Sequence, residues 1–256
     1  MKKLYFSLLT VLLSTGAFAQ AFTGTYDFAG VTTTSGLIDP TPVPTATGIT
    51  FGSFSATNPV ATNPGAAGRF VFDNQPLGAT HNNNVYADLT GSVDSGVYFE
   101  VTLTPQSGYS VDFTSITFTS QRSGTGIRTY VVRSSADSYA TNLPASISPA
   151  NTQLSVEAGN VFFRVNDNIT NAQNGSTITL SGAPFTALES PITFRFYGYN
   201  AEAATGNFSI DNVVISGNIN TLSTNSNQIE GLTMYPNPLK GNTLFLTSTA
   251  NATMSV

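Results

Sequence analysis

The sequence has no cysteine, no tryptophan, a single histidine and few charged residues. Without cysteine there are no disulfides, thiol nucleophiles or thiolate metal ligands, so a packed core must stabilise the fold. Charged residues make up 9% of the chain, against about 25% in ordinary globular proteins, whereas hydrophobic residues make up 40%. This composition predicts a folded chain with a large core rather than a disordered one.

Positive charge is especially scarce. Residues 1–19 hold two of the nine Lys and Arg residues and none of the 14 Asp and Glu residues, so the rest of the chain is acidic. Beyond residue 19 the one lysine is Lys240. A protein that binds duplex nucleic acid or an anionic membrane shows a basic patch, and the sequence contains none. We therefore expect no nucleic-acid partner.

The first residues have the pattern of an export signal. "MKK" is a positively charged start, "LYFSLLTVLLS" is an apolar core, and "AFA" before Gln20 is a small-x-small cleavage site. The apolar core is shorter than the roughly 20 residues that span a membrane, and no other window approaches that length. The sequence predicts a signal peptide over residues 1–19, cleavage between Ala19 and Gln20, and no integral membrane segment afterwards.

Most of the remaining chain has the composition of β-strands. Short runs with a period of two are rich in β-branched and aromatic residues and are separated by Gly, Pro, Asn and Ser. No window has a convincing 3.6-residue period, so helices should be scarce. Strands at this spacing predict an all-β, antiparallel sandwich or barrel. The predicted strands are residues 97–105, 111–120, 127–135, 161–167, 176–182, 192–200 and 207–217.

Two segments interrupt this pattern. Residues 35–66 are rich in Pro, Gly and Thr and are expected to form loops and a short edge strand, because proline cannot donate to a β-ladder. Residues 218–230 are polar without an apolar period and are expected to be a linker. The main domain is therefore predicted over residues 20–217, with a separate segment over residues 231–256.

The main domain contains "SGYSVDFTSITFTSQRSGTGIRTYVVRSSADSYAT" and "PITFRFYGYNAEAATGNFSIDNVVISG". This text resembles a group of secreted bacterial jelly-roll domains that are similar in outline to carbohydrate-binding modules. The resemblance implies an antiparallel jelly-roll β-sandwich in an exported protein. It leaves the ligand open, because sandwiches host many functions.

The tail "LTMYPNPLKGNTLFLTS" is similar to the start of the C-terminal sorting domain of the type IX secretion system of Bacteroidetes. The matching turn is Tyr235, Pro236, Asn237 and Pro238. The resemblance implies the type IX secretion machinery as a partner, removal of the tail, and a protein that is secreted or held at the outer cell surface. Such domains continue for several further strands, so residues 231–256 are interpreted as a truncated sorting domain. The alternative is a short tail with a chance Tyr-Pro-Asn-Pro turn.

No motif in the sequence defines an enzyme. His81 would have to be the base of a Ser/His/Asp hydrolase, but the G-x-S-x-G nucleophile motif is missing. The acidic residues are scattered singly, with no spacing that singles out a glycosidase pair. The sequence therefore favours a protein that is not an enzyme. A hydrolase whose two carboxylates meet only in the folded protein remains an alternative.

A binding face follows from strand alternation. Arg195, Tyr197 and Tyr199 share one face of a predicted strand, and Arg128 and Tyr130 share a face of another. Tyrosine rings stack on the apolar faces of sugars while guanidinium groups bind hydroxyls or carboxylates, so this set predicts a polysaccharide site. The alternative is an ordinary solvent-facing sheet, where Tyr and Arg are common. The absence of tryptophan counts against a tight glycan binder.

A structural calcium ion is a further expectation. The resemblance to carbohydrate-binding jelly rolls implies that Asp211, in the last strand, is a ligand. Asp27 in the first strand would meet it, and Asn212 or Glu100 would add oxygens to the six to eight that calcium takes. The alternative is that Asp211 caps a strand end through backbone hydrogen bonds.

Three functions therefore remain open. The first is a secreted or cell-surface binding or adhesion module, with polysaccharide as the expected ligand. The second is a structural surface protein without a small ligand. The third is a glycan hydrolase. An Arg/Tyr groove in the folded protein would favour the binding module. A flat Thr/Ser/Asn surface would favour the structural protein, and a carboxylate pair in a cleft would favour the hydrolase.

Overall fold

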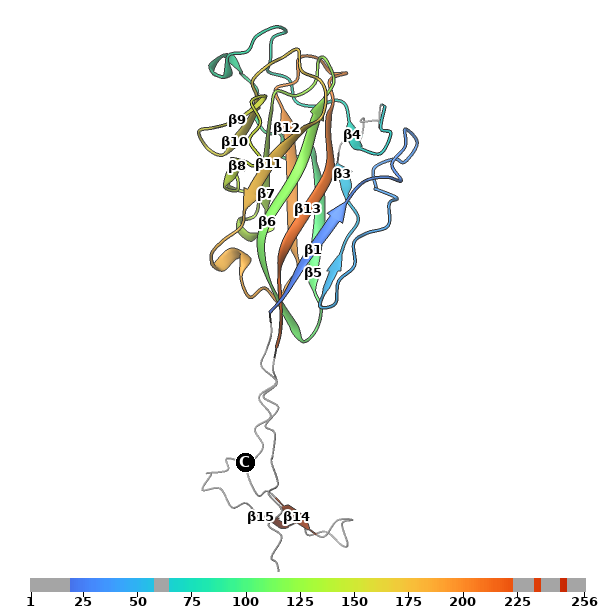
Figure 1. Ribbon diagram of the computed structural model, residues 1–256, viewed down its shortest axis with the longest axis vertical. Helices are drawn as coiled ribbons and strands as arrows, with labels where there is room; N and C mark the ends of the chain where they lie inside the picture. The colour runs from blue at the N-terminus through green and yellow to red at the C-terminus, as the bar shows by residue number, and fades with distance from the viewer. Residues whose placement is uncertain (1–18, 58–64, 223–232, 236–244, 248–256) are drawn as a thin grey trace, which may run out of the picture. The chain divides into compact units, whose positions relative to one another are not determined.

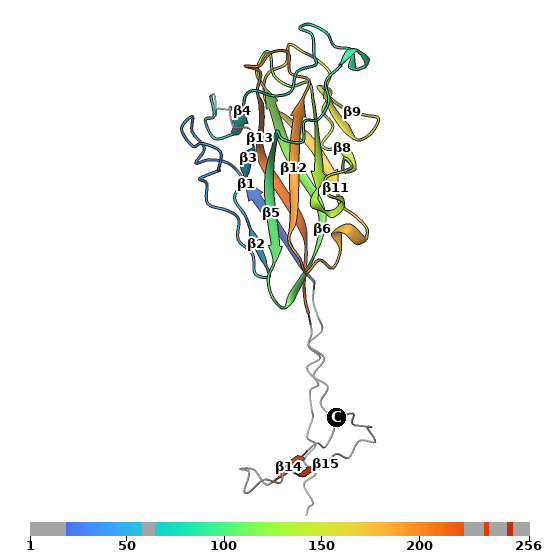
Figure 2. The same ribbon diagram turned by 180° about the vertical axis from the view of Figure 1, so that it is seen from behind.

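The computed structural model describes residues 19–57, 65–222, 233–235 and 245–247. The chain divides into two compact units, with the boundary between Leu222 and Ser223. The first unit is a sandwich of two antiparallel β-sheets, as Figures 1 and 2 show from opposite sides. The all-β class predicted from the sequence is confirmed.

Sheet A forms one layer of the sandwich and contains six strands. Its path is β1-β13-β6-β11-β8, and β4 pairs with the edge of β13 opposite β6, which is the edge that β1 also uses. The long strands β6 and β13 are the centre of the layer. The bounds are β1 (Gln20–Tyr26), β4 (Phe70–Phe72), β6 (Tyr109–Arg122), β8 (Ala145–Ile147), β11 (Gln173–Thr179) and β13 (Phe208–Thr221).

Sheet B forms the other layer and contains seven strands. Its path is β2-β5-β12-β7-β10-β9, and β3 also pairs with β5. The bounds are β2 (Ile49–Phe51), β3 (Ser55–Thr57), β5 (Tyr98–Pro105), β7 (Thr129–Ser134), β9 (Leu154–Glu157), β10 (Val161–Arg164) and β12 (Ile192–Tyr199).

The connectivity is that of a jelly roll. Along the chain β5, β6 and β7 alternate between the sheets, and so do β11, β12 and β13. The first strand pairs with the last, with Tyr26 opposite Val213. Four strands of each layer, β1-β13-β6-β11 and β5-β12-β7-β10, therefore reproduce the eight-stranded arrangement of two Greek keys. The predicted neighbourhood of first and last strands is confirmed.

The core between the layers is rich in phenylalanine. Alternate residues of β5 are buried, as the period of two requires. Phe54 lies at the centre of an aromatic group, with its ring centroid 4.9 Å from Tyr26, 5.2 Å from Phe28 and 5.6 Å from Phe196. This dense packing stabilises a sandwich that, without cysteine, has no disulfides.

The predicted domain boundary at residue 217 is too early. Strand β13 continues to Thr221, where Ile219 pairs with Gln20 on one side and Val111 on the other. Ile219 is buried, so residues 218–221 belong to the sandwich and not to a linker. The polar residues Asn218 and Asn220 alternate with the buried Gly217 and Ile219. They give the sequence of this strand end the composition of a linker. The rest of the predicted linker lies outside the described residues.

Regular helix in the described chain is limited to three short 3-10 turns, η1 (Tyr86–Asp88), η2 (Ser135–Asp137) and η3 (Ala183–Phe185). No helix of the described residues is long and apolar enough to cross a membrane. In the second unit, β14 (Thr233–Tyr235) pairs antiparallel with β15 (Phe245–Thr247). The predicted signal peptide up to residue 18 and the turn residues Pro236, Asn237 and Pro238 lie outside the described residues.

Candidate functional site

The outer face of sheet B carries part of the predicted Arg/Tyr set. The guanidinium of Arg195 lies between two aromatic rings, 3.9 Å from the centroid of Tyr98 and 3.8 Å from that of Tyr139. Its Nε donates to Glu100 Oε2 at 2.9 Å, across the β12–β5 pair. We call these four residues, Tyr98, Glu100, Tyr139 and Arg195, the Arg195 stack. Each is partly exposed.

Tyr197 and Tyr199 lie on the same face but are covered. They are 2% and 8% exposed and pack with partly buried side chains from the segment before β5, including Tyr86 and Val93. The guanidinium of Arg133 also lies 5.5 Å from the Tyr197 ring centroid. Neither ring has a free face for a sugar. Of the predicted residues on this face, Arg195 is the one that remains accessible.

Arg128 and Tyr130 do not lie on this face, so that part of the predicted site is wrong. Tyr130 points into the core, where its ring stacks on Phe162 at 4.9 Å and its hydroxyl contacts Ser120 at 3.0 Å and Ser176 at 2.8 Å. Burial raises the pKa of Tyr130. Arg128 precedes β7 and is fully buried. Alternation separated the two faces of the strand correctly, but it did not tell which face turns inward.

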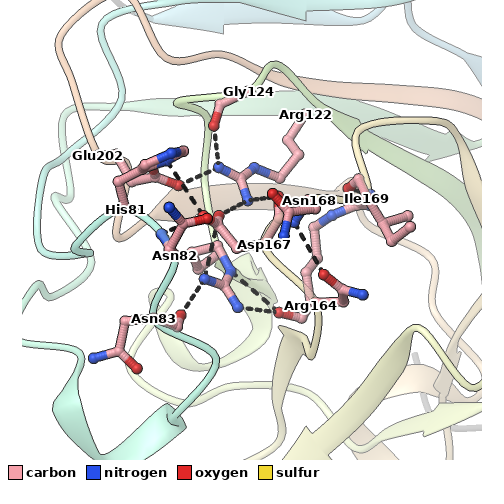
Figure 3. Close-up of polar contacts among 12 residues, drawn as sticks. His81, Asn82, Asn83, Arg122, Gly124, Arg164, Asp167, Asn168, Ile169 and Glu202 are labelled. Carbon is pink, nitrogen blue, oxygen red and sulfur yellow. Dashed lines mark hydrogen bonds and ion pairs between the residues drawn. The ribbon is translucent and has the colours of Figure 1, made fainter.

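A buried ionic cluster occupies the end of the sandwich remote from Gln20 and Thr221 (Figure 3). Arg122, the last residue of β6, forms ion pairs with Asp167 and Glu202, and its Nη2 donates to Gly124 O at 2.8 Å. His81 Nδ1 lies 2.9 Å from Glu202 Oε2 and 3.4 Å from Asp167 Oδ2. We call Arg122, Asp167, Glu202 and His81 the end network. It ties three separate loops to the end of β6.

Two more buried arginines extend this polar region. Arg128 donates from Nη2 to Arg164 O at 2.8 Å, and its Nη1 lies 3.3 Å from Asp167 Oδ1. Arg164 donates to two loop carbonyls, those of Ile169 at 3.0 Å and Asn171 at 3.1 Å. Burial lowers the pKa of Arg164 to about 10. Carbonyl oxygens thus substitute for water around a charge that the fold has buried.

The two carboxylates of the end network do not have the arrangement of a glycosidase. Burial acts to raise the pKa of Asp167, but hydrogen bonds with Glu202, Arg122 and the N–H of Asn82 together lower it to about 2. A glycosidase needs an acid with a raised pKa and carboxyl groups about 5 Å or more apart. Here both carboxylates contact one guanidinium, and an oxygen of Asp167 lies within 4.8 Å of an oxygen of Glu202. This pair therefore does not support the hydrolase alternative.

His81, Asp167 and Glu202 also offer three metal-ligand atoms within 4.8 Å of one another. Each atom already has a partner, because His81 contacts both carboxylates and Asn82 N donates to Asp167 Oδ2 at 2.7 Å. The charges of both carboxylates are balanced by Arg122 and Arg128. We interpret the group as a structural tie for the loop that carries His81.

Asp27 and Asp211 approach each other across the β1–β13 pair. Burial is the main reason that the pKa of Asp211 is raised, and the negative charge of Asp27 adds to it. Asp211 Oδ1 accepts from Asn212 N at 2.7 Å, at a bulge where Asn212 has a φ of 47°. This bond matches the strand-capping alternative. Glu100 lies on sheet B and pairs with Arg195, so it does not join this pair.

Four residues of this polar region were not predicted from the sequence: Arg122, Arg164, Asp167 and Glu202. One signal was available, because Arg122 is in phase with Phe118 and Ser120 along β6, and that phase faces the core. A charged residue at an inward position needs a buried partner. Its two partners lie 45 and 80 positions away in the sequence, which no local pattern reveals.

Comparisons with known proteins assign no family and no activity to the chain. No family model matches the chain, and no curated protein matches it. One solved structure is similar, the K1 cleaved adhesin domain of Lys-gingipain from Porphyromonas gingivalis W83, at 13% identity over 76% of this chain and 97% of that domain, with a TM-score of 0.33. A superposition at that TM-score does not define a shared fold.

Proposed function

We propose that the chain from residue 20 onward, called the mature chain below, is a secreted or cell-surface binding module. It attaches to polysaccharide through the Arg195 stack. The observation that carries this proposal is the guanidinium of Arg195 held between two partly exposed tyrosine rings beside a carboxylate. Tyrosine offers an apolar face to a sugar ring, and the carboxylate accepts from its hydroxyls. Because the ion pair and both ring contacts fix the stack, little side-chain entropy is lost on binding.

The proposal is tested by retention of the mature chain on a panel of soluble and insoluble polysaccharides. We expect retention by at least one of them, and binding about tenfold weaker for Tyr98→Ala and for Arg195→Ala, because each removes a central contact. Thr23→Ala is the control, since Thr23 is exposed on sheet A. No retention of the wild type would overturn the proposal and favour a structural surface protein.

We also propose that Asp27 and Asp211 contribute to a calcium site. The charge of Asp27 adds to the cost of keeping the carboxylate of Asp211 ionised, and a bound cation would lower that cost. The site needs further oxygens, since calcium takes six to eight. The polysaccharide panel is therefore run in calcium and again in chelator, and the melting temperature is measured in both. An identical melting temperature in the two buffers would overturn the calcium assignment.

We propose that residues 231–256 are a sorting signal for this module and that the type IX secretion machinery recognises it. The support is the sequence of the turn Tyr235, Pro236, Asn237 and Pro238 and the strand after it. In a host with this secretion system, we expect the chain that carries residues 231–256 outside the cell and the variant lacking them in the periplasm. Fractionation and immunoblotting measure this. Equal export of both chains would contradict the sorting role.

A further inference from the structure

A polar cavity of about 330 Å³ lies over sheet A, on the opposite layer from the Arg195 stack. Its floor is a row of side chains across three strands, because Ser209 of β13 pairs with Val71 of β4 on one side and Gln121 of β6 on the other. The neighbouring residues Phe70 and Phe208 face the core between the layers, so strand alternation puts Val71 and Ser209 on the other face of sheet A, where each is 2% exposed. The polar residues that line the cavity include Arg69, Gln121, Ser123, Thr170, Asn207 and Ser209.

Arg69 places a guanidinium at the cavity, and several of its N–H donors have no acceptor among the described residues. A guanidinium has five N–H donors. Within the described part of the chain, Arg69 makes one side-chain hydrogen bond, from Nη2 to Gly65 O at 2.9 Å, and its Nε is buried without an acceptor. The positive charge of Arg69 acts to lower the pKa of Asp211, but no ion pair joins the two side chains among the described residues. Donors of Arg69 therefore remain available.

The other lining residues provide neutral hydrogen-bonding groups. No hydrogen bond within the described residues uses the side-chain amides of Gln121 and Asn207. The described lining contains no carboxylate, and its second arginine, Arg122, belongs to the end network. A site with an incompletely paired guanidinium, two available amides and no acidic group among its described lining favours a ligand with an anionic group and several hydroxyls.

We propose that this cavity binds an acidic sugar unit, with Arg69 at its carboxylate and Gln121 and Asn207 at its hydroxyls. The volume lies at the lower end of the range for ligand pockets, which suits one sugar unit better than an oligosaccharide. The inference rests on the proposed function and adds the class of polysaccharide, one that carries carboxylate groups. The cavity and the Arg195 stack would bind it on opposite layers of the sandwich.

The test titrates the mature chain with sodium galacturonate, galactose and sodium sulfate by calorimetry. We expect binding of galacturonate that weakens with added salt, and binding of galactose at least tenfold weaker because it leaves the guanidinium unpaired. Arg69→Met should weaken galacturonate binding at least tenfold, and Gln121→Ala should weaken it less. Arg69→Lys keeps the charge but loses the planar fork, so an intermediate loss is expected. Thr23→Ala, at an exposed position of sheet A that does not line the cavity, is the control and should bind as the wild type does.

Each other outcome overturns a defined part of the proposal. Equal galacturonate affinity in the wild type and Arg69→Met would overturn the assignment to this cavity. Equal binding of galactose and galacturonate would overturn the acidic class, and binding of sulfate without galacturonate would leave an anion site only. Galacturonate binding without retention on any polysaccharide would overturn the proposed function alone. Retention that Tyr98→Ala abolishes, without galacturonate binding, would overturn the cavity alone.

Discussion

Replacing Arg122 by Met should lower the free energy of unfolding by about 3–5 kcal/mol, because it leaves Glu202 without its buried arginine and Asp167 with Arg128 alone. Asp167 and Glu202 are 1% and 4% exposed at the side chain, and the guanidinium of Arg122 pairs with both. A loss of this size corresponds to a fall in melting temperature of roughly 10 °C for a domain of this length. Denaturant unfolding and thermal melting of the mature chain measure it.

Two further variants define the cause of that loss. Arg122→Lys keeps the charge but cannot donate to both carboxylates in the same planar geometry, so it should lie between the wild type and Arg122→Met. Arg69→Met removes a partly exposed arginine with one side-chain hydrogen bond among the described residues, and it should cost less than about 1 kcal/mol. A similar loss for Arg69→Met and Arg122→Met would contradict the interpretation of the end network as a structural tie.

Replacing Phe54 by Ala should also cost about 3–5 kcal/mol, through lost burial and a cavity in the aromatic group. Phe54 is fully buried, and its ring centroid lies 6.3 Å from that of Phe70 in addition to the closer rings of Tyr26 and Phe28. Because the surrounding rings belong to both layers, they cannot collapse into the space without moving strands. The midpoint of urea unfolding measures the loss.

The matched comparison for Phe54 is an apolar residue at the surface. Leu77 is 55% exposed, so Leu77→Ala should change stability by less than about 0.5 kcal/mol. Phe54→Leu should lie between the two, since leucine fills part of the space. A loss below 1 kcal/mol for Phe54→Ala would show that the segment between β1 and β4 does not contribute to the cooperative core.

The strands and the fold class were predictable because they depend on local pattern. The period of two in residues 97–105 appears as β5, and the run at residues 111–120 lies within β6. The short strands β3, β4, β8 and β9 were not predicted, because three or four residues show little of a period, although the equally short β10 lies within the predicted run at residues 161–167. The signal peptide and most of the sorting turn lie outside the described residues and stay predictions.

The candidate sites were less predictable, for two physical reasons. Alternation assigns residues to two faces of a strand but not to core or solvent, and so Tyr130 was placed on a surface although it lies between the sheets. Local pattern also says nothing about what covers an outward face. Tyr197 is on the expected face, yet the segment that precedes β5 buries it.

The sequence by itself determined the all-β class, the main strands and the sharing of one strand face by Arg195, Tyr197 and Tyr199, because each follows from local composition and period. Only the tertiary structure decided which charges meet. Arg122 pairs with carboxylates 45 and 80 positions away, and the cavity beside Arg69 forms where β4, β13 and β6 lie side by side. Such sites depend on strand register and loop paths, which the whole packed sandwich fixes at once.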